Sequence, residues 1–388
     1  MPKTYRVGII GGGGIARSHM EGYERVDNVE VVSVADPQPM ARTRFQGEYD
    51  LSSSYESAEQ MLSAENLDIV SVCTWHLLHP SPTIAAAEAG VKGIICEKPM
   101  PIGMGDANRM VEACEKSGTR LVISHQRRFT PGWEKARELM QEKVVGDLIM
   151  LTGRVREGLT NWATHTIDGM RFILDDPEAL WVMGALERRT DRYERDTAIE
   201  DSCMGIFTFT DNVQALIQSD LNLGGESAGA FQVRGTDGLL EVTERRVRLF
   251  NSSSNGWQDI QLDTDADRRA IGGETNAAQT RELIAWLEGG PEHRGSARKA
   301  RATVKIMMAL YESARQNKVI HMPLQELAYP LDLMIQEEKV KVEVPGRYDI
   351  RGFLKLDVAD ESEYDRLRDE GLNRHAAMRR LSEARSGE

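Results

Sequence analysis

The sequence predicts an α/β protein of two domains. The first is built on a doubly wound parallel sheet and the second, also α/β, on a large open mostly antiparallel sheet. Two observations support the two-part architecture. The chain has 388 residues, more than one hydrophobic core usually holds. Short apolar runs alternate with helical patterns up to about residue 125, and longer runs of alternating polarity follow.

Short apolar runs in the first part indicate buried strands, namely "YRVGII" (5–10), "VEVVSVAD" (29–36), "LDIVSVCT" (67–74), "VKGIICE" (91–97) and "TRLVISH" (119–125). They have few polar interruptions, as expected where helices cover both faces of a parallel sheet. Between them, "SPTIAAAEAG" has Ser81 as a candidate helix N-cap and Gly90 just beyond the helix end. This alternation predicts a doubly wound domain over residues 1–125.

The second part, residues 126–345, begins with a helical pattern in "FTPGWEKARELMQEKVVGDL". Turn residues then separate "IMLTGRVRE", "ALWVMGALERR", "DSCMGIFTFT", "VQALIQSDLN" and "AFQVRGTDGLLEVTERRVRLF", which is typical of an antiparallel sheet. A long helix is expected over 296–316, with an apolar stripe that packs in the core. Residues 346–388 form a charged C-terminal extension, and from about residue 357 we expect a peripheral helix or frayed tail without chemistry.

The composition limits the possible partners. A formal net charge of −13 argues against nucleic acid and anionic membranes, whose phosphates would be repelled. No apolar run approaches the roughly 20 residues that cross a bilayer. Cys73, Cys96, Cys114 and Cys203 match no zinc spacing and are expected to be reduced packing thiols. These features predict a soluble, cytoplasmic protein without a metal site.

A glycine run follows the first predicted strand, in "VGIIGGGGIARSHMEGY". The register that fits a dinucleotide fingerprint places Gly11 in the tight turn and Gly13 where the backbone approaches a pyrophosphate. Ala16 then allows the helix to pack on the strand. The helix N-terminal N–H groups near Gly14 and Ile15 would face the anion.

An acidic residue ends the second predicted strand at about the distance that this fingerprint requires. The carboxylate of Asp36 can accept both ribose hydroxyls of NAD, whereas it would repel the 2′-phosphate of NADP. The alternative is that Asp36 only starts the "ADPQP" turn. We therefore expect NAD as the cofactor, with NADP the less favoured choice.

With "GIIGGGGIA", "ADP", "WHLLHPSPTIAAAEAG" and "CEKPM" in this order, the chain resembles the Gfo/Idh/MocA family (glucose–fructose oxidoreductase / inositol dehydrogenase / MocA). The resemblance continues through "HQRRFTPGWEKARELM", "THTIDGMRFIL", "RGTDGLLEV" and "HMPL", and spans roughly residues 3–335. It implies a Rossmann domain followed by an α/β domain with an open sheet. Members commonly associate through that sheet, so we expect a homodimer or homotetramer.

The resemblance implies a catalytic pair. The family's EKP motif falls on Glu97, Lys98 and Pro99, and its lysine hydrogen-bonds the reacting hydroxyl of the substrate. A histidine that opens a later helix aligns with His165 and takes the hydroxyl proton. Many relatives carry an aspartate four residues earlier, where this chain has Asn161. The amide could orient the histidine or bind a hydroxyl, but it has no charge and cannot act as a base.

Other positions are expected beside the cofactor. Thr74, Trp75 and His79 fall on the loop that borders the cofactor in relatives, and Trp75 replaces the usual proline, so we expect the loop to differ in shape. His79 fits helix support better than catalysis. Gln126 and Arg127 follow the last Rossmann strand and are expected to reach the nicotinamide and the substrate.

Four further residues complete the set of candidate site residues and their expected neighbours. Asp168 and Arg128 are expected to have structural roles, as helix-start carboxylate and ion-pair partner. Trp162 could stack on a sugar ring or equally fill the core. Arg156 is a candidate substrate contact. Only one histidine and one acid converge here, which does not favour zinc.

The resemblance implies an NAD-dependent oxidoreductase that moves a hydride between a secondary alcohol or ketone of a sugar, cyclitol or sugar derivative and nicotinamide. Two alternatives remain open at this stage. One is a variant that retains NAD and uses transient oxidation for elimination or glycoside cleavage. The other is a non-catalytic NAD-binding regulator.

Overall fold

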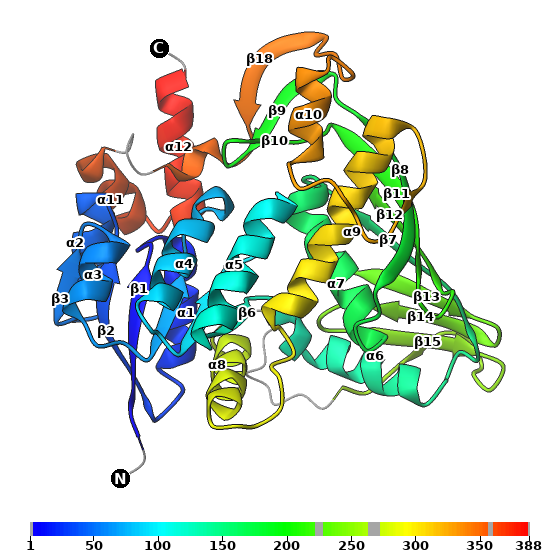
Figure 1. Cartoon of the computed structure of the whole chain (residues 1–388), viewed down its shortest axis with the longest axis horizontal. Coiled ribbons are helices and arrows are strands. Elements are labelled where there is room, and N and C mark those ends of the chain that lie inside the picture. Colours follow the sequence, from blue (N-terminus) through cyan, green and yellow to red (C-terminus); the bar gives the residue numbers. More distant parts are fainter. Residues whose placement is uncertain (1–2, 222–227, 263–271, 356–359, 387–388) are drawn as a thin grey trace.

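The computed structural model describes residues 3–221, 228–262, 272–355 and 360–386. Its first part is a six-stranded parallel sheet in the order β3-β2-β1-β4-β5-β6 (Figure 1). The strands are β1 (Tyr5–Ile10), β2 (Val29–Ala35), β3 (Ser53–Tyr55), β4 (Ile69–Val72), β5 (Gly93–Cys96) and β6 (Arg120–Ile123). Five of them match the predicted runs. β3 was not predicted, because a three-residue edge strand leaves no periodicity to detect.

Helices connect these strands, as doubly wound topology requires. They are α1 (Gly14–Tyr23), α2 (Pro39–Glu48), α3 (Ala58–Ala64), α4 (Pro80–Glu88) and α5 (Met104–Ser117). The predicted cap of α4 is wrong: His79 takes the N-cap position, and Ser81 already lies inside the helix. Pro80 sets this start, because its fixed φ and missing N–H suit the first helical position. Gly90 follows the helix with φ +80°, as expected.

The second part is a nine-stranded sheet in the order β16-β15-β14-β13-β7-β12-β11-β8-β17. The strands are β7 (Leu148–Val155), β8 (Ala179–Glu187), β11 (Ser202–Phe209), β12 (Gln214–Ser219), β13 (Phe231–Gly235), β14 (Gly238–Val242), β15 (Val247–Asn251), β16 (Gln258–Asp259) and β17 (Ile320–His321). Among the described strand pairs of this sheet, β7 and β12 run parallel and the others antiparallel. The predicted fold class is confirmed.

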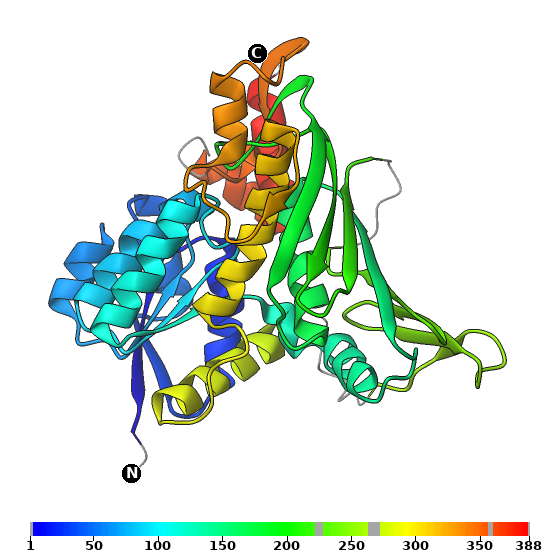
Figure 2. The ribbon, with the colours of Figure 1, turned by 45° about the vertical axis from the view of Figure 1, so that its right-hand side comes forward.

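Helices cover one face of the second sheet, as Figure 2 shows. They include α6 (Pro131–Gln141), α7 (Thr164–Ile173) and α9 (Ala297–Gln316), and α10 (Pro330–Gln336) packs on α9. The remaining helix of this part of the sequence is α8 (Gly273–Leu287). α9 passes between the two sheets and packs on β8, with its predicted stripe buried at Ala300, Val304 and Tyr311.

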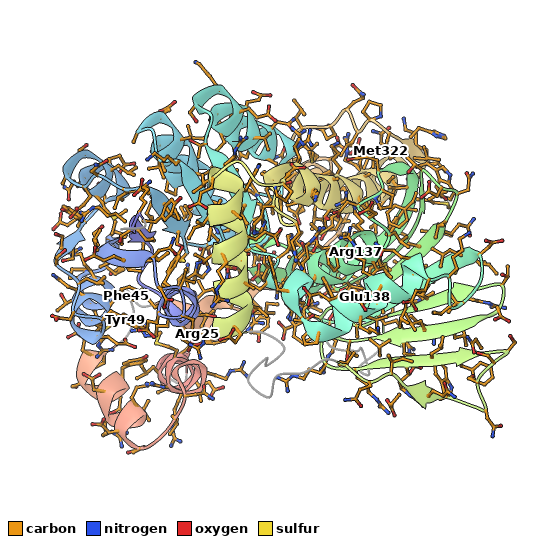
Figure 3. All side chains as sticks on the ribbon, turned by 90° about the horizontal axis from the view of Figure 1, so that it is seen from below. Arg25, Phe45, Tyr49, Arg137, Glu138 and Met322 are labelled. Carbon is orange, nitrogen blue, oxygen red and sulfur yellow. The ribbon has the colours of Figure 1, made fainter. Side chains whose placement is uncertain are left out.

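α8 belongs to the second part in sequence but packs against α1 of the first. A Cβ on Gly22 of α1 would come within 2.5 Å of the Cβ of Asn276, so the two helices are in close contact. In the view from below, α8 lies between α2, marked by Phe45 and Tyr49, and α6, marked by Arg137 and Glu138 (Figure 3). The boundary between the two domains at residues 125/126 remains a prediction. α8 follows this boundary in the sequence but packs on the domain that precedes it.

The C-terminal extension is ordered into defined elements. β18 (Val344–Asp349) pairs with β9 (Thr190–Glu194), which also pairs with β10 (Thr197–Ala198). A 3-10 turn, η4 (Gly352–Leu354), and the helices α11 (Glu361–Asp369) and α12 (Arg374–Ser386) follow. Asp365 of α11 pairs with Arg44 of α2 at 2.5 Å, so the extension reaches the Rossmann domain (Figure 1).

The interior matches the composition-based expectations on two points. The four cysteines are free and buried, as predicted for packing thiols. Among the helices in the described ranges, none is long and apolar enough to cross a membrane.

Candidate active site

The loop after β1 has the conformation that the glycine fingerprint requires. Gly11 adopts φ +94°, and a Cβ there would lie 2.9 Å from the backbone oxygen of Cys73. Gly13 is the N-cap of α1 and offers no side-chain cap, so the first N–H groups of the helix are open to an anion. Ala16 is fully buried where α1 meets the sheet. The geometry is that of the predicted register.

Asp36 follows β2 and contacts the same loop. Its Oδ2 accepts the Gly12 N–H at 2.8 Å and its Oδ1 accepts the Gln38 N–H at 2.8 Å. A carboxylate has about four lone-pair sites, so both oxygens retain accepting capacity. The side chain is half-buried beside the glycine loop and lies outside the lining of the cavity described next.

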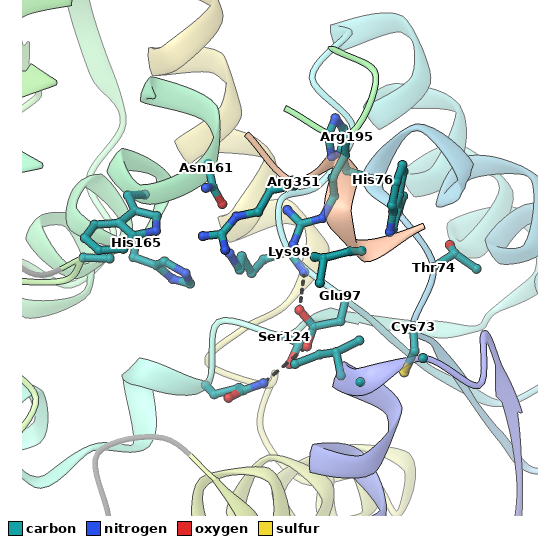
Figure 4. A pocket seen from close by; sticks show the side chains of 18 of the residues that line it. Cys73, Thr74, His76, Glu97, Lys98, Ser124, Asn161, His165, Arg195 and Arg351 are labelled. Atoms are coloured by element: carbon teal, nitrogen blue, oxygen red, sulfur yellow. Dashed lines mark hydrogen bonds between the residues drawn. The ribbon is translucent and has the colours of Figure 1, made fainter. Parts of the chain in front are cut away.

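A cavity of about 840 Å³ lies at the carboxyl ends of the Rossmann strands and continues to the second domain (Figure 4). Open α/β sheets bind ligands at this edge. Most residues predicted for the site line it, namely Gly13, Gly14, Ile15, Thr74, Trp75, Glu97, Lys98, Gln126, Arg127, Asn161, Trp162 and His165. Gly11, Asp36, His79 and Arg156 do not line it. The structure therefore brings predicted residues from both domains together on one cavity.

Glu97 is the buried anchor of the EKP segment. One of its oxygens lies 3.0 Å from Nε2 of His19 and accepts from the amide of Gln126 at 3.2 Å. Burial lowers the pKa of His19, but Cys73 and Glu97 outweigh it and raise the value to about 10. The negative charge of Glu97 is thus offset by protonated His19, which lies behind the cavity wall.

Lys98 is half-buried, and its Nζ makes no hydrogen bond within the described residues. Burial, followed by the positive charges of Arg195 and Arg127, lowers its pKa to about 8. An ammonium without a protein partner in a cavity is available to donate to a bound oxygen.

His165 opens α7, is 5 % exposed and faces the same space as Lys98 (Figure 4). Among the described residues, Nδ1 of His165 has no hydrogen-bond partner. Burial, then the charges of Arg127 and Lys98, hold its pKa well below 6.5. At neutral pH the ring is therefore neutral and able to accept a proton.

Asn161 lies in a π-helical turn, η3 (Leu159–Ala163), that runs directly into α7. The wider turn breaks the i, i+4 alignment assumed for a regular α-helix. The amide nitrogen of Asn161 donates to Glu157 Oε2 at 3.3 Å, not to His165. The interpretation that Asn161 orients His165 is therefore not supported by this contact, while its place on the cavity wall fits a hydroxyl contact.

Asp168 is structural, as the sequence indicated. It is fully buried and accepts from Arg128 at 2.7 and 2.8 Å, and Arg128 also bonds Asp176. Nδ1 of His125 lies 3.5 Å from Asp168. This network packs behind His165, whose ring lies edge-on to His125 with centroids 6.1 Å apart.

Three further residues that the sequence singled out, each aromatic or basic, lie in different surroundings. Trp162 is half-buried and lines the cavity, so it is placed for a ligand contact. Arg156 is exposed, stacks over Trp162 with Cζ 5.8 Å from the ring centroid, and lies outside the cavity. His79 is buried, and its nitrogens lie 3.1 Å from the backbone oxygens of Pro99 and Thr74, so it ties two loops together.

Sequence reasoning missed several lining residues, namely Arg17, His76, Arg195, Ala228, Glu244, Arg245, Arg351 and Leu354. Glu244 accepts from Nε of Arg127 at 2.6 Å, a pairing that spans 117 positions. Arg195 lies at the β9–β10 turn with φ +49°, and Arg351 belongs to the C-terminal extension. No local pattern marks such residues, because only the tertiary fold brings their segments to the cavity.

Two family descriptions match the chain. One, an oxidoreductase family with an NAD-binding Rossmann fold, matches residues 5–125. The other, the GFO/IDH/MocA C-terminal domain, matches residues 133–241.

Similar proteins span most of the chain. A D-apiose dehydrogenase of Paraburkholderia graminis is 25 % identical over 84 % of this chain and 92 % of its own length. A myo-inositol 2-dehydrogenase of Thermotoga maritima is 27 % identical over 68 % of this chain and 80 % of its own. A levoglucosan dehydrogenase solved with NADH and levoglucosan superposes with a TM-score of 0.73 at 20 % identity, covering 83 % of this chain and 100 % of that one. The chain belongs to the Gfo/Idh/MocA family of NAD-binding oxidoreductases.

Proposed function

We propose that this protein is an NAD-dependent oxidoreductase that moves a hydride between a secondary alcohol or ketone of a sugar, cyclitol or sugar derivative and nicotinamide. One observation supports the proposal: Lys98 and His165, both with lowered pKa values, line one cavity with the glycine loop, and within the described residues neither Nζ of Lys98 nor a ring nitrogen of His165 has a hydrogen-bond partner. The names of the similar dehydrogenases support the substrate class.

The residues present fit NAD. The N–H groups of Gly14 and Ile15 border the cavity at the start of α1, where a pyrophosphate is stabilised. Asp36 would accept the ribose hydroxyls and repel a 2′-phosphate, which favours NAD over NADP. Thr74, Trp75 and Gln126 would border the nicotinamide half. Bound NAD supplies the hydride acceptor, or donor, at its nicotinamide ring.

Lys98 and His165 divide the work on the substrate oxygen. The ammonium of Lys98 donates to that oxygen and stabilises the negative charge that develops as the proton leaves. The neutral ring of His165 takes the proton. Arg127, whose terminal nitrogens remain free of hydrogen bonds to described residues, and Trp162 hold the rest of the substrate.

The test is a panel of monosaccharides, inositols and glycosides mixed with NAD and then NADP, with the absorbance of the reduced cofactor followed in time. We expect NADH to form with at least one compound, and Lys98→Met to lower kcat/KM by at least about 100-fold. Unchanged turnover by Lys98→Met would show that the catalytic assignment is wrong. Turnover of substrate without any accumulation of NADH would instead favour a retained-cofactor reaction.

We also propose that the second sheet forms a homo-oligomer through its uncovered face. Gly184 and Gly205 face Leu310 of α9, so strand alternation turns Met183 and Met204 to the opposite face. These methionines are 55 % and 41 % exposed. Ile206, two residues after Met204 on β11, pairs with Met183 of β8, and Figure 2 shows no helix of the described residues over this side. A second copy would bury this apolar patch.

We further propose that the protein acts in the cytoplasm. The support is that the four cysteines are free and buried, as in a reducing compartment. Fractionation of cells that express the tagged full chain would locate it, and recovery outside the cytoplasmic fraction would contradict the proposal.

A further inference from the structure

Two arginines that the family fingerprint did not indicate line the cavity with Lys98. Arg195 comes from the β9–β10 turn, and Arg351 comes from the C-terminal extension, which lies outside both family matches at 5–125 and 133–241. Figure 4 shows Arg351 near Asn161, on the side of the cavity that His165 borders. The C-terminal extension thus supplies a cation to the cavity wall.

One carboxylate fixes the backbones of both arginines. Oδ1 of Asp349 accepts the N–H of Arg195 at 3.0 Å and the N–H of Arg351 at 2.8 Å. Asp349 ends β18, and β18 pairs with β9. The β9–β10 hairpin and the C-terminal extension are therefore held together as one unit. The two guanidinium groups are therefore presented from a shared, pre-organised support.

Each guanidinium is also held from one side by an acid. Arg195 pairs through Nη1 with Glu194, and Arg351 pairs through Nη2 with Glu157, which also accepts from Asn161. The side chains are only 24 % and 19 % exposed, so both are largely withdrawn from solvent. Nη1 of Arg351 and Nη2 of Arg195 make no hydrogen bond to a described residue. These donors remain for a ligand in the cavity.

The charged side chains that line the cavity are mostly positive. Lys98, Arg195, Arg245 and Arg351 are cations, the acids paired with Arg195 and Arg351 are Glu194 and Glu157, and Arg127 is offset by Glu244 and Glu97 by His19. This excess of positive charge attracts an anionic group on the ligand. Planar guanidinium groups also match a carboxylate through paired hydrogen bonds.

We propose that the substrate carries a carboxylate, and that Arg195 and Arg351 bind it beside Lys98. The chemical class is thus a hydroxy acid derived from a sugar or cyclitol, of the aldonic or uronic acid type. This inference rests on the proposed function, since it names the substrate class of the same site. Arg351 makes the C-terminal extension a determinant of specificity.

The experiment compares matched pairs of acid and neutral compounds, D-glucuronate with D-glucose and D-galacturonate with D-galactose, with D-glucose 6-phosphate as the dianion. Turnover is followed with NAD, and binding to the NADH-saturated full-length protein is measured by calorimetry. We expect an acid to exceed its neutral partner in kcat/KM by about 100-fold, and Arg351→Gln to raise KM for that acid by about 10- to 100-fold with a smaller change in kcat. Arg366→Gln on the exposed surface of α11 is the matched control and should change neither.

The outcomes separate the two proposals. Turnover and binding that are equal for acids and neutral compounds, or best with the phosphate, would overturn the carboxylate site and leave the proposed function standing. No turnover of any compound, but tighter binding of acids that Arg351→Gln removes, would support the site and reject the function. If Arg351→Gln fails to fold, as judged by circular dichroism, Arg195→Gln makes the same test.

Discussion

Lys98 and His165 both have lowered pKa values, with opposite chemical results. Burial disfavours the charged form of each side chain, and the neighbouring cations add to the effect. Lys98 starts from 10.5, so at about 8 it keeps its proton at neutral pH. His165 starts from 6.5, so a decrease leaves it neutral. At pH 7 the same electrostatic environment therefore gives a proton donor, Lys98, and a proton acceptor, His165.

The pH dependence of kcat/KM for alcohol oxidation follows from these directions. In the proposed function, activity needs neutral His165, so the acid limb should lie below pH 6.5. The proposed function also needs the Lys98 ammonium, so activity on the alkaline limb should fall as pH rises through about 8. In Lys98→Arg the alkaline limb should move beyond the measurable range, because arginine keeps its proton. Lys305→Arg, at a surface pair with Glu178, is the control, and an acid limb above 6.5 would count against this assignment.

Residues that stand in sequence motifs could be predicted to lie together, while their catalytic roles stay predictions. Lys98 and His165 align with family positions, and the structure places both on one cavity. Arg195 and Arg351 could not be found this way, since a turn residue and a tail residue meet there only through the β9–β18 pairing. The contact of Asn161 with Glu157 was not predicted, because a π-helical turn leaves no clear trace in the sequence.

At the scale of single elements, the β1–α1 loop makes the cofactor site depend on one backbone conformation. Gly11→Ala would put a Cβ at φ +94°, 2.9 Å from the Cys73 oxygen. Positive φ costs a non-glycine residue about 1–3 kcal/mol, so we expect the Kd for NADH to rise by about tenfold or more. Fluorescence titration with NADH measures this. Gly47→Ala in α2 is the control, because a Cβ there meets nothing within 4 Å, and equal Kd values in both variants would refute the assigned role.

α7 is tied to the start of the second domain by a buried ion network. Arg128 is fully buried between Asp168 and Asp176. Arg128→Met would leave buried Asp168 without its bonded cation and Asp176 with only Arg171 and Lys299, at 3.8 and 3.7 Å, and we expect a loss of about 3–5 kcal/mol in the free energy of unfolding. Urea denaturation checks this against Lys135→Met, which removes only a surface pair with Glu138 and should change stability little. A loss equal to that of the control would show that the network is not structural.

At the scale of the whole molecule, the order of strands and helices was largely readable from the sequence. Buried parallel strands such as β1 and β4 are continuous apolar runs, and the alternating strands of the second sheet have one covered face. The packing of α8 on α1 and the reach of the extension to α2 were not readable. Both depend on contacts such as Arg44 with Asp365, which lie 321 positions apart.

Assembly is expected to depend on the open face of the second sheet. Replacing Met183 and Met204 together by Lys places charge on this face, which should shift the protein to a smaller species in sedimentation velocity. Val344→Lys, at an exposed position of β18, is the control. An unchanged oligomer in the double variant, or a monomeric wild type, would remove this face as the interface.

The central claim is that Lys98 and His165 act on a carbinol whose hydride passes to NAD. The most direct test uses the best substrate of the panel with deuterium at the oxidised carbon, followed by mass analysis of the recovered NADH. We expect deuterium in the NADH formed by the wild type, and a loss of that product in Lys98→Met and His165→Asn. Product formed without deuterium in NADH, or labelled NADH at the wild-type rate in both variants, would contradict it.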